Sequence, residues 1–163
     1  MSKTVTLKLY KERFKFSSGH FTIFSATDRE DCHGHNFAVH VTMRCGVQAD
    51  GLAFDYAVYK RRIDDLCKKL DEKFLLPDRS EHLKITKEPP YICAQFGKEK
   101  LMFLERDALV LPISNTTLEE LSHYFLDELL ASNDQADMAI SGVAIEIANG
   151  PGQSAEAHWG ELQ

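Results

Sequence analysis

The chain has 163 residues, of which 44% are hydrophobic and 27% charged, and its formal net charge is −6. This length suits one domain with a sizeable core, so we predict a single domain over residues 1–163. The acidic balance argues against a nucleic-acid partner, which would require a basic face. No stretch approaches the roughly 20 apolar residues that span a membrane, so we expect no membrane association.

The cysteines indicate the compartment. Cys32, Cys45, Cys67 and Cys93 are scattered, without a Cys-x-x-Cys pair. This pattern fits free thiols in a reducing environment better than a disulfide framework or a thiolate metal site. The N-terminal residues contain no apolar segment typical of a secretory signal. We therefore predict a cytoplasmic protein.

The first predicted element is a strand over residues 4–16. Apolar Val5, Leu7 and Leu9 alternate with polar residues, which is typical of a strand with one face in water. Phe14 then shifts the apolar pattern. The strand brings His20 just beyond its end.

The second predicted strand begins at the sequence His33-Gly34-His35 and has an apolar face formed by Val39, Val41, Met43 and Cys45. Side chains two residues apart on a strand share a face, so both imidazoles should emerge together. With His20 from the neighbouring strand, they could hold one divalent metal and leave a fourth position open, as in catalytic zinc sites. The remaining histidines are interpreted as ordinary surface or core residues: His40, His82, His123 and His158.

From residue 57 onward, the spacing of the apolar residues changes from that of a strand to that of a helix. Residues 57–76 carry an apolar stripe at helical spacing that includes Tyr59, Ile63, Leu70 and Phe74, so we predict an amphipathic helix there. In residues 78–112 the periodicity of apolar residues is weaker. We predict a short hairpin there, formed by segments 92–96 and 101–104.

A second helix is predicted to begin at Thr117. Its hydroxyl can cap the helix while Glu120 reaches back to the cap residue. A polar linker over residues 132–137 follows, and then two strands, over 143–147 and 154–159. The order strand, strand, helix, helix, strand, strand predicts an α+β fold, with an antiparallel four-stranded sheet and two helices on one face.

The segment Ser18-x-His20, followed by His33-Gly34-His35-Asn36-Phe37, resembles the zinc motif of the 6-pyruvoyl-tetrahydropterin synthase / 6-carboxy-tetrahydropterin synthase family. Further matches follow in the family's order nearly to the end of the chain. The resemblance implies the tunnelling fold (T-fold), in which trimers close their sheets into a barrel and stack as homo-hexamers. It also implies that residues 78–112 are an inserted hairpin, because this interval is often shorter in the family.

The resemblance implies roles for several residues. His20, His33 and His35 would bind Zn²⁺, and Glu146 would bind the guanidine-like edge of a pterin through two parallel hydrogen bonds. Thr117 and Glu119 match a Thr-x-Glu segment near the same pocket. Periodicity alone favours a solvent-facing strand residue for Glu146, and Glu119 is equally a first-turn acid stabilised by the helix dipole.

The proton-transfer residues depart from the family pattern. Arg29 stands where the family has a catalytic cysteine, so Cys32 and Glu30 are the two candidate bases. We expect partial burial to raise the pKa of Glu30 toward the working range. Asp71 matches an Asp-His pair of the family, but Glu72 replaces the histidine; the alternative is an ordinary charged helix end.

The function implied is a zinc-dependent lyase acting on 7,8-dihydroneopterin triphosphate. Its product would be 6-pyruvoyl-tetrahydropterin, 6-carboxy-tetrahydropterin or 6-hydroxymethyl-dihydropterin. Two alternatives remain open at this point. The chain could be a pterin-binding protein that has lost the lyase reaction, or a metal-stabilised interaction module with no small ligand.

Overall fold

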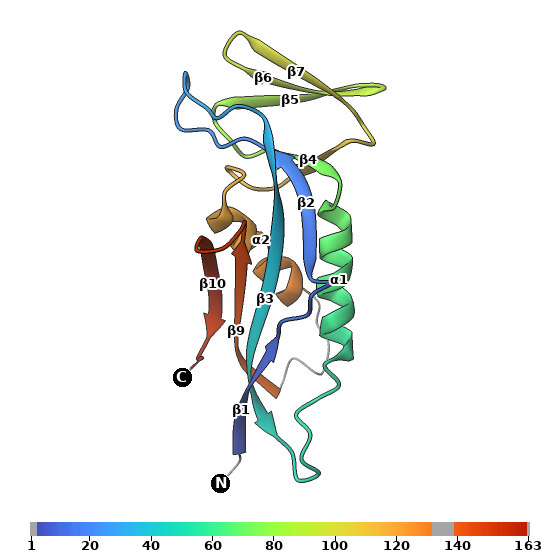
Figure 1. The fold of residues 1–163 in the computed structure, drawn as a ribbon, viewed down its shortest axis with the longest axis vertical. Coiled ribbons are helices and arrows are strands. Elements are labelled where there is room, and N and C mark those ends of the chain that lie inside the picture. The colour runs from blue at the N-terminus through green and yellow to red at the C-terminus, as the bar shows by residue number, and fades with distance from the viewer. Residues whose placement is uncertain (1–2, 132–138, 163) are drawn as a thin grey trace.

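The computed structural model describes residues 3–131 and 139–162, and Figure 1 shows their arrangement. The predicted linker over residues 132–137 lies outside the described residues. Neither described helix is long and apolar enough to cross a membrane. The elements follow in the order β1 (Lys3–Leu9), β2 (Lys15–His20), β3 (His33–Val47), α1 (Ala57–Leu70), β4 (Lys73–Pro77), β5 (Leu83–Glu88), β6 (Tyr91–Phe96), β7 (Glu99–Leu104), β8 (Ala108–Leu111), α2 (Leu118–Leu130), β9 (Ile140–Ala148) and β10 (Ser154–Gly160).

The larger sheet is built around β3. Its strand order within the described residues is β10-β9-β3-β2-β4-β8, and β1 also pairs with β3. The β2–β4 and β4–β8 pairs are parallel, while the others are antiparallel. The predicted α+β class is confirmed, but the predicted four-stranded antiparallel sheet is wrong: the sheet is mixed and has seven strands.

The strand predicted over residues 4–16 is split in two. β2 pairs with the first part of β3 and β1 with its last part. Between them the backbone turns, and the Phe14 amide donates to the Lys11 carbonyl at 2.9 Å. The buried residues change parity across this turn, from Leu9 to Phe14 and Phe16. A continuous strand would place these side chains on opposite faces, so the chain must break.

Both helices cover one face of the larger sheet, as predicted. Val39, Val41 and Met43 of β3 are fully buried and join Ile63 of α1 and Phe125 of α2 in one core. The side chains between them on β3 point to the other face and are partly or fully exposed. The sheet therefore has a helix face and an open face.

Helix α1 ends at Leu70, not at the predicted Leu76. Asp71 is extended and Glu72 has a positive φ of 58°, so the helical hydrogen bonds stop there. Residues 73–77 instead form β4, in which Leu75 and Leu76 are fully buried. An apolar run of this kind is ambiguous between helix and buried strand, and pairing with β2 and β8 decides it.

Residues 83–104 form a second, three-stranded sheet with order β5-β6-β7. The predicted hairpin is present as β6 and β7, but β5 is an additional strand. β8 lies within the predicted insertion, 78–112, yet belongs to the larger sheet. The small sheet lies at the end of the molecule where β2 ends and β3 begins (Figure 1). Its own buried cluster includes Phe96 and also contains Phe21, which follows β2.

Helix α2 begins as predicted. Thr117 is its N-cap, and its hydroxyl accepts a hydrogen bond from the Glu120 amide at 3.3 Å. The reciprocal half of the predicted capping box is wrong: the Glu120 carboxylate accepts from the Ser114 amide at 2.8 Å. The acid thus fastens the preceding loop to the helix start.

The four cysteines are free, as predicted, and they differ in reactivity. Burial raises the pKa of Cys45 to about 11 and that of Cys67 to about 12, from an ordinary 9.0. Because the thiolate is the nucleophile, a raised pKa keeps these thiols inert until the pH approaches those values. We expect brief iodoacetamide treatment of the native protein at about pH 8 to modify exposed Cys32 alone. Peptide mass spectrometry checks this, and rapid native labelling of Cys67 would contradict it.

Candidate metal centre and active site

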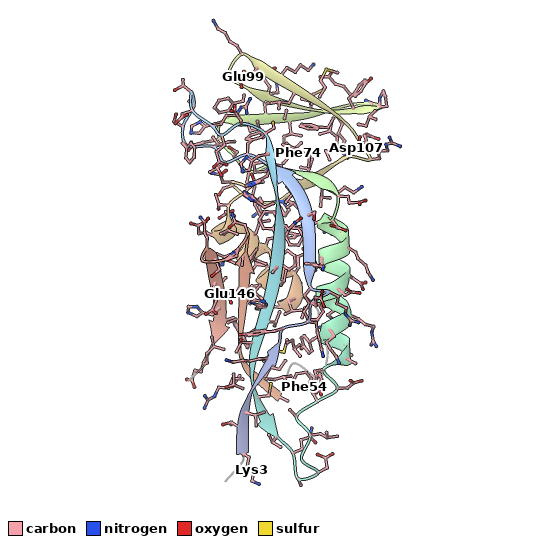
Figure 2. All side chains as sticks on the ribbon, in the orientation of Figure 1. Lys3, Phe54, Phe74, Glu99, Asp107 and Glu146 are labelled. Atoms are coloured by element: carbon pink, nitrogen blue, oxygen red, sulfur yellow. The ribbon has the colours of Figure 1, made fainter. Side chains whose placement is uncertain are left out.

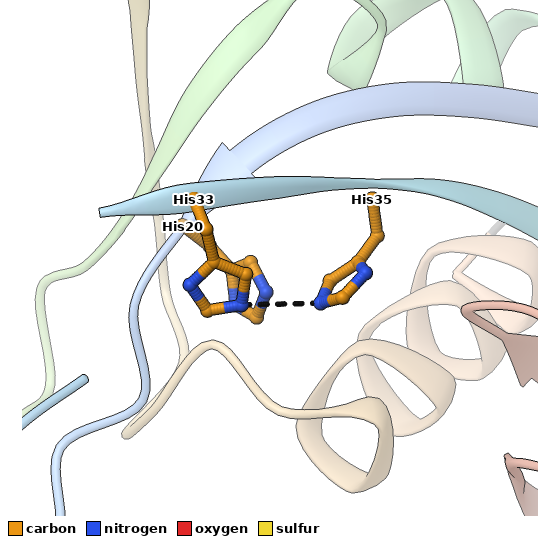
Figure 3. Close-up of side chains that lie close together, drawn as sticks. All are labelled: His20, His33 and His35. Atoms are coloured by element: carbon orange, nitrogen blue, oxygen red, sulfur yellow. Dashed lines mark hydrogen bonds between the residues drawn. The ribbon is translucent and has the colours of Figure 1, made fainter. Parts of the chain in front are cut away.

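Three histidines meet at the end of the β2–β3 pair. His20 is the last residue of β2 and lies opposite His33, the first residue of β3, while His35 follows on the same face. One ring nitrogen of each lies within 4.8 Å of the others, and the Nε2 atoms of His33 and His35 are 3.1 Å apart (Figure 3). At Gly34, an added Cβ would lie 3.1 Å from the Ser18 carbonyl oxygen, so a glycine keeps the two strands close. The predicted grouping is therefore present.

Backbone carbonyls hold two of the rings. His20 Nδ1 lies 2.8 Å from the Thr116 carbonyl oxygen, and His33 Nδ1 lies 2.8 Å from the Asp31 carbonyl oxygen. A carbonyl only accepts hydrogen bonds, so both Nδ1 atoms carry hydrogen in the neutral rings and each Nε2 presents a lone pair. Metal-binding histidines are commonly oriented by such contacts.

The Nε2 lone pairs fit a divalent cation. His20 Nε2 is buried and has no hydrogen-bond partner among the described residues. A buried acceptor without a partner costs free energy, and a shared cation removes that cost. Burial, with the neighbouring imidazoles, lowers the pKa of His20, although the Thr116 carbonyl opposes the shift. The ring is consequently held in the neutral form that binds a metal.

The three histidines open onto a cavity of about 430 Å³. Glu30, Thr117 and Glu119 also line it, so the structure brings three more of the predicted site residues to the histidines. Asn149 and Gln153, from the β9–β10 connection, complete the polar part of the wall. The cavity combines a cation-binding corner with carboxylates and a hydroxyl, which is an arrangement suited to polar small molecules.

Glu30 is fixed beside the histidines. Its Oε2 accepts a hydrogen bond from the Thr22 amide at 2.9 Å and lies 3.8 Å from His33 Nε2. Burial acts to raise the pKa of Glu30, but hydrogen bonds from Thr22 outweigh it and the net shift is downward. The expectation of a raised pKa is therefore wrong, because a hydrogen-bond donor faces the carboxylate. The group is an ionised proton acceptor.

Cys32, the other candidate base, is placed differently. It is exposed and is not among the described residues that line the cavity. Arg29, which stands at the position expected for a cysteine, also lies outside the cavity lining, and its guanidinium binds Glu99. Within one chain, Glu30 is thus the candidate base that reaches the histidines.

Glu146 lies on the open face of the sheet. It is paired with His40 across β3 and β9, and its Oε2 lies 3.4 Å from His40 Nδ1. Even-numbered residues of β3 point away from the face that carries His33 and His35. Figure 2 shows Glu146 partway along the sheet, well below the end that carries Glu99. The chain alone does not bring Glu146 to the histidines.

Asp71 and Glu72 also lie outside the lining of the three-histidine cavity. The Asp71 carboxylate accepts from the Ser17 amide at 2.7 Å, which ties the end of α1 to β2. Glu72 lines a second cavity of about 490 Å³, and the lining of that cavity also includes Ser17, His35 and Asn36. Neither acid lines the cavity of the three histidines among the described residues.

Sequence reasoning missed Thr116. This residue is buried, its carbonyl orients His20, and its hydroxyl donates to the Phe21 carbonyl at 2.6 Å. Asn115 next to it bonds both backbone groups of Ile23. In the sequence, Asn115 and Thr116 show only as part of a polar run before α2. The residues that they contact, His20 and Ile23, lie more than ninety positions earlier in the chain.

Comparisons with known proteins identify the family of this chain. Residues 8–158 match the family described as 6-pyruvoyl tetrahydropterin synthase. A protein of Methanocaldococcus jannaschii named "Putative 6-carboxy-5,6,7,8-tetrahydropterin synthase" is 28% identical over 144 residues, which are 86% of this chain and 87% of that protein.

Solved structures show the same fold. The 6-pyruvoyl tetrahydropterin synthase of Plasmodium vivax is 27% identical, with a TM-score of 0.89 over 98% of this chain and 99% of that one. The 6-pyruvoyl tetrahydropterin synthase of Plasmodium falciparum is 29% identical, with a TM-score of 0.89 over 97% of this chain and 99% of that one. The P. vivax protein has also been solved with a catalytic glutamate replaced by alanine or cysteine. The chain therefore belongs to the 6-pyruvoyl tetrahydropterin synthase family and is a lyase of the 6-pyruvoyl / 6-carboxy tetrahydropterin synthase type.

Proposed function

We propose that this protein is a zinc-dependent lyase that acts on 7,8-dihydroneopterin triphosphate and releases 6-pyruvoyl- or 6-carboxy-tetrahydropterin. The observation that carries the proposal is the convergence of one ring nitrogen from each of three histidines on a cavity that is also lined by Glu30. Three nitrogen ligands with an open fourth position are typical of catalytic zinc. Family membership supports the proposed substrate class.

His20, His33 and His35 would hold the zinc ion, oriented by the carbonyls of Thr116 and Asp31. Bound zinc would supply Lewis-acid polarisation of a hydroxyl or carbonyl oxygen on the substrate side chain. Thr117 and Glu119, at the start of α2, line the same cavity and would bind the pterin there.

Glu30 is the proposed base that removes a proton from the substrate side chain. Its pKa is lowered, so the carboxylate is ionised, and it lies 3.8 Å from His33 Nε2, where it would accept a proton from a substrate carbon held in this cavity. The glutamate named as a catalytic residue in the P. vivax relative supports a carboxylate in this role. Cys32 is the weaker candidate because it is outside the cavity.

The proposed roles of Glu146, Asp71 and Glu72 require a second copy of the chain. All three lie outside the histidine cavity of their own chain. We therefore propose a homo-oligomer, a hexamer arranged as a dimer of trimers, in which the open face of one copy adjoins the cavity of another. Glu146 would then bind the pterin edge, and the Asp71–Glu72 pair would assist proton transfer.

Product identification tests the proposed function. Zinc-loaded protein incubated with 7,8-dihydroneopterin triphosphate should form a new pterin product, and this product should not form when a chelator is present. The product mass distinguishes a retained three-carbon side chain, as in 6-pyruvoyl-tetrahydropterin, from a one-carbon carboxylate or hydroxymethyl group.

Intact substrate with zinc-loaded protein would overturn the lyase assignment. It would favour the pterin-binding alternative, for which Glu72 and the displaced cysteine are the specific observations. In that case the protein should still bind the pterin, which equilibrium dialysis measures directly.

A further inference from the structure

Arg29 connects the small sheet to the loop that carries Glu30. Its Nε and Nη2 donate to Glu99 Oε2 at 2.9 and 2.6 Å, and its Nη1 donates to the Glu30 carbonyl oxygen at 2.7 Å. Its guanidinium carbon lies 4.9 Å from the ring centroid of Phe21 and 5.8 Å from that of Phe96. The Arg29 side chain is only 16% exposed. One cation therefore contacts the β6–β7 turn region, the residue after His20 and the backbone of the proposed base.

The hydrogen bond from Arg29 to the Glu30 carbonyl lies in the segment between Glu30 and His33, both of which line the histidine cavity. The Glu30 carbonyl is held by Arg29, and the next carbonyl, that of Asp31, accepts from His33 Nδ1. The Glu30 amide donates to the Thr22 carbonyl at 2.9 Å, and the Thr22 amide donates to the Glu30 carboxylate. These four hydrogen bonds hold the Glu30 side chain and the backbone between Glu30 and His33 at the edge of the cavity.

We propose that Arg29 is a positioning residue, which holds the Glu30 carboxylate against the metal corner by anchoring its loop to the small sheet. The inserted strands β5–β7 then have a role in the reaction, although the described residues of β5–β7 line no part of the histidine cavity. The role of Glu30 in this inference rests on the proposed function; the anchoring itself does not.

The chemistry of the contact requires arginine. A guanidinium offers five N–H donors in a fixed planar fork and stacks on aromatic rings, whereas an ammonium is a compact point charge. Lysine could bind either Glu99 or the Glu30 carbonyl, but it cannot keep the fork contact and the ring stacking together. Glu99 is 59% exposed, so water weakens its ion pair and the Glu30 contact carries more of the effect.

The test compares Arg29→Met, Arg29→Lys and a matched control, Lys100→Met. Lys100 forms an ion pair with Glu88 at 3.2 Å on the same small sheet, so its loss changes the charge by the same amount without touching the loop. We expect Arg29→Met to lower kcat by about 10- to 100-fold with KM changed less than about threefold, because a base displaced by about 1 Å loses that much rate. The kcat of Arg29→Lys should lie between those of Arg29→Met and the wild type. The kcat of Lys100→Met should match that of the wild type.

A double variant tests the Glu99 contact. Glu99→Gln alone should lower kcat by a smaller factor, and in the Arg29→Met background it should have no further effect, because the two residues act through one contact. Independent, multiplicative losses would overturn the inference. So would an Arg29→Met enzyme with wild-type kcat, or an equal loss in Lys100→Met.

Hydrogen exchange measures the anchoring without activity. In Arg29→Met, the amides of Thr22 and Glu30 should exchange at least about tenfold faster, while those of α1 stay as protected as in the wild type. Unchanged exchange at Thr22 and Glu30, or faster exchange everywhere, would overturn the positioning role. If the wild type makes no pterin product, the exchange experiment still decides whether Arg29 orders the loop, so the two proposals fail separately.

Discussion

Replacing His33 by alanine is expected to remove the bound metal and the lyase activity together. The group of possible ligands found among the described residues consists of His20, His33 and His35, so removing one ring leaves two nitrogens. Metal polarisation contributes several kcal/mol to catalysis, which corresponds to a loss in kcat/KM of about thousandfold or more. Zinc content after dialysis, measured with kcat/KM, checks the expectation.

His123→Ala is the matched control for this experiment. His123 lies on α2, is exposed and does not line the histidine cavity. The variant should keep one zinc per site and wild-type turnover, because the same side chain is removed from a place without a ligand role. A His33→Ala protein that retained both its zinc and its full activity would show that the three histidines are not the metal site.

Replacing Glu30 by glutamine is expected to lower kcat by about 10²- to 10⁴-fold, the range for loss of a positioned general base. Glutamine keeps the shape of the side chain, and its amide oxygen can still accept from the Thr22 amide, so the loop should stay in place. Zinc should remain bound, since Glu30 is not one of the three histidine ligands. Single-turnover kinetics with zinc-loaded protein measure the change in the chemical step.

Cys32→Ser separates the two candidate bases. The thiol is exposed and outside the cavity, so this variant should keep kcat within about threefold of the wild type. If Cys32→Ser were inactive and Glu30→Gln active, the thiol would be the base and the loop would have to rearrange when substrate binds. Since both variants keep the three histidines, equal zinc contents make the comparison one of proton transfer alone.

The sequence by itself determined the elements that depend on local periodicity. The alternation along β3 predicted both its buried face and the shared direction of His33 and His35, because successive side chains on a strand point to opposite faces. The Thr117 cap and the β6–β7 hairpin were equally local. The grouping of His20 with the other two histidines followed from one additional assumption, that two consecutive strands pair.

Only the tertiary structure decided which segments meet across long sequence distances. The burial of Leu75 and Leu76 fits helix or strand alike, and parallel pairing with β2 and β8 made this segment β4. The contact of Arg29 with Glu99 joins residues seventy positions apart. Periodicity shows that a face is covered but carries no information about the segment that covers it.

The same limit applies to the candidate site. The sequence named Glu146, Asp71 and Glu72 alongside the histidines, but the pairing of β9 with β3 placed Glu146 on the opposite face of the sheet. Register determines the face, because a shift of one residue reverses every side chain, and register is set by contacts along the whole strand. The sequence thus named the candidate residues, and the packing of distant strands decided which of them share one cavity.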